Sequence, residues 1–155
     1  MNKKSIIFNG IIAGLAIISV IVMLLPINMG FSCLGFAQIA LAEEGGIMLA
    51  LPIILAFAFS IVVLGFAVLT LLTACNVIKS AKAGKAFRIV NLVLSCVGFI
   101  FAGFVFAMFV SQGGFLIGFF IPTLFYLALI VLTSIDLAQS KKFNKTIELS
   151  QENPQ

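Results

Sequence analysis

Residues Lys79–Arg88, with the sequence KSAKAGKAFR, decide how this chain is organised. They form the only strongly charged segment in the middle of 155 residues that are 63% hydrophobic and 9% charged. A soluble domain carries about 25% charged residues, because polar groups must coat its surface. The composition therefore predicts an all-α, polytopic membrane protein, which the basic segment divides into two apolar halves.

Four runs of apolar residues are long enough to cross a bilayer. A helix needs about 20 such residues to span about 30 Å of hydrocarbon. We expect transmembrane helices at about residues 6–25, 47–74, 88–110 and 115–136. The apolar residues 31–42 are too few to cross, so they form either an irregular loop or a short helix, lying at the interface or tucked against the bundle.

These crossings make up one four-helix transmembrane domain over residues 1–140. Residues 141–155 are polar, and we expect them to form a short, disordered cytoplasmic tail. A positive start precedes the first run, as in a signal peptide, but the apolar core exceeds the usual 7–15 residues. We therefore expect the first helix to be retained.

All the basic side chains fall on one side of the four crossings. They are Lys3, Lys4, Lys79, Lys82, Lys85, Arg88, Lys141, Lys142 and Lys145. The other side carries Glu43 and Glu44 and has no Lys or Arg. Cytoplasmic loops are rich in Lys and Arg, so we expect an antiparallel up-down bundle with both termini cytoplasmic.

The position of the positive charges also indicates what they contact. They flank apolar helices, which favours anionic lipid headgroups over nucleic acid as their partner. Docking of a cytosolic protein onto the basic loop or tail is the alternative. Lys is far more frequent than Arg, and no organelle-targeting segment is visible. We therefore expect an integral protein of a bacterial cytoplasmic membrane.

Small residues recur at helical spacing in three of the crossings. Close backbone approach is a main means of helix association in lipid, and small residues permit it. The candidate packing or partner faces are Gly10 with Gly14, Gly114 with Gly118, and the stripe Asn91, Ser95, Gly98 and Ala102. Two interpretations of the stripe remain: an internal seam of the bundle, or a face that binds a partner helix or lines a small cavity.

The sequence lacks most of the groups that do chemistry in membranes. It has no His and no CxxC, and we expect Arg88 and Asp136 to sit at the ends of crossings, where they can reach headgroups or water. An enzyme, a bound metal or cofactor, and antiport through a membrane carboxylate are therefore disfavoured.

The remaining functional expectation is a non-enzymatic protein that acts through helix contacts. It would be an accessory subunit, an assembly factor or an immunity-type protein, with a membrane-protein partner or a second copy of itself. The alternative is an oligomeric channel or carrier for a neutral or apolar solute. Its motivation is the helix break expected at Pro122 and the polar groups of Asn91, Ser95, Thr123 and Tyr126.

Overall fold

The computed structural model describes residues 3–26, 32–43, 46–78, 80–111 and 117–152. Within these ranges the chain forms five helices and no strand. The helices are α1 (Lys3–Leu24), α2 (Cys33–Ala42), α3 (Ile47–Ala74), α4 (Ala81–Ser111) and α5 (Ile117–Glu152). Four of them are long and apolar enough to cross a membrane. The expected all-helical class, with four helices long and apolar enough to cross a membrane, is thus confirmed for the described residues.

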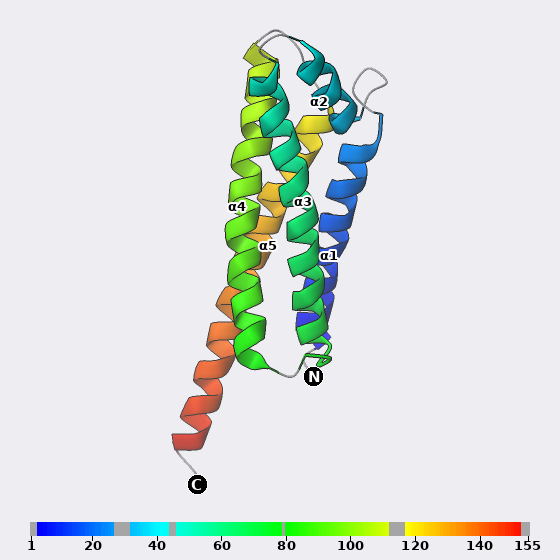
Figure 1. Cartoon of the computed structure of the whole chain (residues 1–155). Coiled ribbons are helices and arrows are strands. Elements are labelled where there is room, and N and C mark those ends of the chain that lie inside the picture. The colour runs from blue at the N-terminus through cyan, green and yellow to red at the C-terminus, as the bar shows by residue number, and fades with distance from the viewer. Residues whose placement is uncertain (1–2, 27–31, 44–45, 79, 112–116, 153–155) are drawn as a thin grey trace.

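The four long helices lie side by side, and α2 lies at one end of them (Figure 1). Helix α3 packs against α1, α2 and α4, while α5 packs against α4 and α1. Each long helix therefore has at least two neighbours. We call the end that holds α2 the α2 end. The opposite end, where α4 begins and where Arg88 of α4 pairs with Asp136 of α5, we call the ion-pair end.

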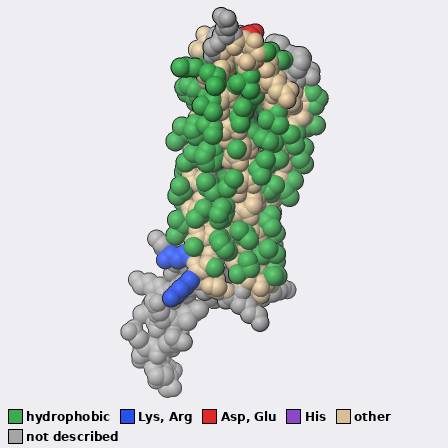
Figure 2. Space-filling model, viewed as in Figure 1, with side chains coloured by type: hydrophobic (Ala, Val, Ile, Leu, Met, Phe, Trp, Pro, Cys, Tyr) green, Lys and Arg blue, Asp and Glu red, His purple; other side chains and the backbone are tan. Residues whose placement is uncertain are grey.

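The flank between these two ends is covered by hydrophobic side chains (Figure 2). Exposed Ile, Leu and Val side chains occur on all four long helices, for example Ile7, Ile61, Ile100 and Leu127. Lys and Arg atoms are visible at the ion-pair end, and a few Asp or Glu atoms are visible at the α2 end (Figure 2). An apolar band between two polar ends is the surface expected of a membrane protein.

Residues 33–42 form a helix, which settles the question of a helix or a loop for this segment. Ser32 caps α2, its hydroxyl accepting a hydrogen bond of 3.1 Å from the Gly35 N–H. Cys33, Ala37 and Ala40 recur every three to four residues and are buried on one face. The helix is thus tucked against α3 by its small residues.

The turn from α2 into α3 requires glycine at position 46. A Cβ added to Gly46 would overlap the backbone carbonyl of Ala40 and lie 3.2 Å from the Glu43 oxygen. Helix α3 ends at Ala74, as expected, and Asn76 follows with φ of 63°. Asn adopts this left-handed conformation more readily than most residues, which suits it to a helix end.

Helices α4 and α5 are longer than expected. Helix α4 begins at Ala81 instead of residue 88. At this start the Ser80 hydroxyl accepts a hydrogen bond of 3.3 Å from the Ala83 N–H. Helix α5 continues to Glu152, through most of the segment expected to be disordered. Between Pro122 and Pro154 the sequence contains neither Gly nor Pro, so no residue type that ends a helix interrupts it.

Candidate functional site

The predicted stripe of α4 faces the inside of the molecule. All four members of the stripe are buried: Asn91, Ser95, Gly98 and Ala102. A Cβ added at Gly98 would lie 2.5 Å from Cζ and 2.7 Å from the hydroxyl oxygen of Tyr126, with Cε1 closer still. The stripe therefore packs directly against α5, which is the geometry of an internal seam.

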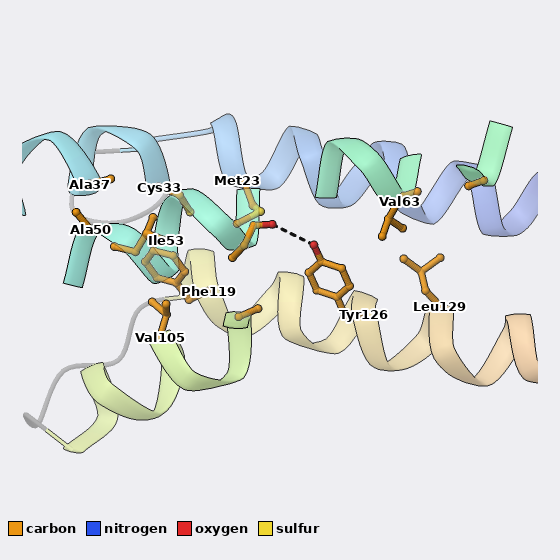
Figure 3. Close-up of a cluster of buried hydrophobic side chains, with 14 of the residues drawn as sticks. Met23, Cys33, Ala37, Ala50, Ile53, Val63, Val105, Phe119, Tyr126 and Leu129 are labelled. Carbon is orange, nitrogen blue, oxygen red and sulfur yellow. Dashed lines mark hydrogen bonds between the residues drawn. The ribbon is translucent and has the colours of Figure 1, made fainter. Parts of the chain in front are cut away.

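Tyr126 joins α5 to α3 through hydrogen bonds in the middle of the helices. Its hydroxyl lies 2.7 Å from the Ser60 hydroxyl. The Ala56 carbonyl lies within hydrogen-bond distance of both hydroxyls, at 3.1 Å from that of Tyr126 and 3.0 Å from that of Ser60. The Ser60 hydroxyl also lies 3.2 Å from the Met23 sulfur. Figure 3 shows the Tyr126 ring pointing across the core, with the dashed line marking its bond to α3. Tyr126, 1% exposed, is therefore held at its tip as well as by packing.

Toward the α2 end the core becomes apolar and aromatic. Phe119 of α5 stacks on Phe109 of α4 at a centroid distance of 5.6 Å, and Phe109 meets Phe36 of α2 edge-on at 5.7 Å. Ile53 and Val105 are fully buried beside Phe119 (Figure 3). Apolar and aromatic side chains from four helices thus fill the core at this end.

The ion-pair end holds charged groups in its interior. The Arg88 Nε lies 2.7 Å from the Asp136 Oδ2, and the two side chains are only 14% and 6% exposed. Asn9 of α1 donates a hydrogen bond of 3.4 Å to the same carboxylate oxygen. It donates a second bond, of 2.9 Å, to the Ser5 carbonyl. Helices α1, α4 and α5 therefore meet at Asp136.

This ion pair differs from what the sequence led us to expect. We expected Arg88 and Asp136 to reach headgroups or water, whereas they face each other between helices. The reason is register: the two side chains stand at the same level on neighbouring helices. Burial of a charge is costly unless an opposite charge and hydrogen bonds compensate it, and each group supplies this for the other.

The remaining predicted residues are not gathered at one place. Gly10 and Gly14 lie on α1, and a Cβ added to either would meet no other atom within 4 Å. Lys82 and Lys85 are exposed in the first turns of α4. Gly114 and Lys79 lie outside the described residues. The side chains of Lys3, Lys4, Lys141, Lys142 and Lys145, and the surroundings of Gly118, are likewise outside the description.

The acidic and cysteine side chains are the candidate metal ligands in the part of the chain that the structure describes. This part contains no group of three or more His, Cys, Asp or Glu side chains that could hold a metal ion. Cys33 is buried in the first turn of α2, Cys75 is exposed after α3, and Cys96 is half-buried in α4.

The comparisons with known proteins gave no match. No protein-family model matches the chain, and neither a curated protein nor a solved structure matches it.

Proposed function

We propose that the chain forms an antiparallel up-down bundle in a bacterial cytoplasmic membrane, with both termini on the cytoplasmic side. Three contacts support this arrangement, because each joins helices at a different height. Asp136 meets Asn9 and Arg88 at one end, Tyr126 meets Ser60 in the middle, and aromatic rings meet at the α2 end. The basic residues near α4 support the proposed orientation, since Lys and Arg favour the cytoplasmic side.

Cysteine labelling tests this orientation. Cys75 and Cys96 are first replaced by Ser and Ala, and a single cysteine is introduced as Glu43→Cys or Lys85→Cys, both at exposed positions. A membrane-impermeant maleimide on intact cells should label position 43 and leave position 85 unlabelled until the cells are permeabilised. The opposite pattern contradicts the proposed sidedness.

We further propose that the protein acts without catalysis, by binding another transmembrane helix along α1. The observation that carries this proposal is the contrast between two sets of glycines. Gly98 is covered by Tyr126, whereas Gly10 and Gly14 face open space between exposed isoleucines such as Ile7 and Ile11. Small residues one turn apart allow two helix backbones to approach closely in lipid.

Substitution of these glycines tests the helix-binding proposal. Gly10→Ile and Gly14→Ile should abolish co-purification and cross-linking of a partner in mild detergent. Gly65→Ile is the matched control, because Gly65 of α3 also has no atom within 4 Å of an added Cβ. Two differently tagged copies of the chain distinguish a second copy from a different protein. A wild-type protein that purifies as a monomer without any partner contradicts the proposal.

The alternative, an oligomeric channel or carrier for a neutral solute, has weaker support. The polar groups it would use, those of Asn91, Ser95 and Tyr126, are buried within one chain. A pore between copies needs polar groups on the outer face, whereas the face shown in Figure 2 is mainly apolar and exposed Ile, Leu or Val side chains occur on all four long helices. Solute flux into liposomes that contain the wild-type protein would favour the channel over helix binding.

A further inference from the structure

Three side chains between α4 and α5 bury polar atoms that have no hydrogen-bond partner in the described part of the chain. They are Asn91, Ser95 and Thr133, with exposed fractions of 1%, 0% and 1%. We call these three residues the polar seam. Both polar atoms of the Asn91 amide are unpartnered, as are the Ser95 and Thr133 hydroxyl oxygens.

The two hydroxyls of the polar seam differ from other Ser and Thr hydroxyls in the long helices. A Ser or Thr in a helix can satisfy itself by donating to a carbonyl three or four residues earlier. Thr70 donates in this way to Ala67 at 2.8 Å, and Ser134 donates to Ile130 at 2.7 Å. The hydroxyls of Ser95 and Thr133 make no such bond and remain available to another partner.

The polar seam lies between two contacts that fix α4 against α5. Arg88 meets Asp136 on one side of it, and Gly98 meets Tyr126 on the other. From Arg88 to Gly98, and from Tyr126 to Asp136, the separation is about 15 Å along each helix at 1.5 Å per residue. The two contacts are therefore in register, and the polar seam occupies the interval between them.

We propose that the polar seam binds internal water. In the interior of a membrane protein, polar groups without partners are costly, whereas one buried water satisfies about three of them. The Asn91 amide supplies a donor and an acceptor, and the Ser95 and Thr133 hydroxyls each supply both. Water also donates and accepts, and these neutral groups offer no charge that would select a metal ion or an ionic ligand.

The water would link two parts of the molecule that are otherwise separate. On one side stands the Arg88–Asp136 pair, and on the other stands the Tyr126 hydroxyl with its bonds to α3. The apolar packing around Phe119 closes the α2 end of the core. Internal water is thus confined to the half of the core nearer the ion-pair end.

The sign of a stability change tests the proposal. Thr133→Val keeps the shape of the side chain and removes its hydroxyl. If the polar seam is hydrated, the variant loses bonds to water and its melting temperature in detergent falls by about 2–6 °C. If the polar seam is dry, removing an unsatisfied group raises the melting temperature, which overturns the proposal. Thr70→Val is the matched control, because the Thr70 hydroxyl is buried but bonded within its own helix.

Radiolytic footprinting of the wild-type protein provides a second readout that needs no variant. Hydroxyl radicals formed from a bound water oxidise the side chains beside it. Leu129 lies one turn from Thr133 and is 1% exposed, while Phe119, at the α2 end, is 0% exposed. Hydration predicts oxidation of Leu129 and protection of Phe119, although phenylalanine is the more reactive side chain. Protection of both residues overturns the proposal.

Discussion

The packing of Gly98 against Tyr126 makes a strong prediction for the variant Gly98→Ala. The added methyl group would lie 2.5 Å from the ring carbon Cζ and 2.7 Å from the hydroxyl oxygen of Tyr126, so the ring must move. The ring is 1% exposed, and its hydroxyl is tied to Ser60 and to the Ala56 carbonyl. Its displacement therefore breaks hydrogen bonds as well as packing.

The size of the effect follows from three contributions. Overpacking a filled core costs about 1–3 kcal/mol. Each lost hydrogen bond costs about 0.5–1.5 kcal/mol. Replacing Gly by Ala inside a helix returns about 1 kcal/mol. The net loss in the free energy of unfolding is therefore about 1–3 kcal/mol, or about 3–10 °C in melting temperature for a chain of this size.

The buried thiol of Cys33 provides the assay. With Cys75 and Cys96 replaced by Ser and Ala, a thiol-reactive fluorescent dye reports unfolding when Cys33, 0% exposed in the structure, becomes accessible on heating. Gly65→Ala is the control, because its methyl group meets no atom within 4 Å. We expect this control to melt at or slightly above the wild-type temperature.

A double-mutant cycle shows whether the loss arises from this one contact. In a Tyr126→Leu background, Gly98→Ala should cost much less than in the wild type, because the ring that it strikes is absent. Equal costs in the two backgrounds, or a Gly98→Ala protein that melts like Gly65→Ala, would refute the packing described for α4 and α5.

Five further variants, at three places in the fold, can be tested with the same dye assay. Asp136→Asn should destabilise the protein by about 3 kcal/mol because Arg88 is left buried without a countercharge, and the double change Arg88→Met/Asp136→Leu should recover most of that loss. Gly46→Ala should lower the melting temperature by several degrees and expose Cys33 early, because its methyl group overlaps the Ala40 carbonyl. Asn76→Gly should stabilise by about 0.5–1 kcal/mol and Asn76→Val should destabilise, because the φ of 63° suits glycine and disfavours a β-branched residue.

The sequence predicted the four long apolar helices well, because length and hydropathy alone define such segments. Helix α3 has the expected bounds, residues 47–74. The ends of α4 and α5 were not predicted, because an apolar run stops at the first charges whereas a helix continues through residues such as Ala81 and Lys82, which favour helix. The length of an apolar run therefore predicts the apolar part of a helix and not where the helix begins or ends.

The candidate site was only partly predictable. Helical spacing placed Asn91, Ser95, Gly98 and Ala102 on one face, but periodicity does not say whether that face meets a helix, lipid or water. The contact of Arg88 with Asp136 was missed because it depends on the relative register of two helices. The sequence did contain a signal for this ion pair: the two residues have opposite charges and lie at the same end of adjacent apolar runs.

The meeting of three helices at Asp136 has a consequence for how the chain is made. A ribosome delivers α5 last, so the Arg88 guanidinium reaches the bilayer before the carboxylate that neutralises it. Asn9, which is synthesised before both, also lacks its hydrogen-bond partner Asp136, which lies 127 residues further along the chain. A nascent chain that stops short of α5 therefore keeps an uncompensated cation near the start of α4, and so differs electrostatically from the folded protein until α5 has been made.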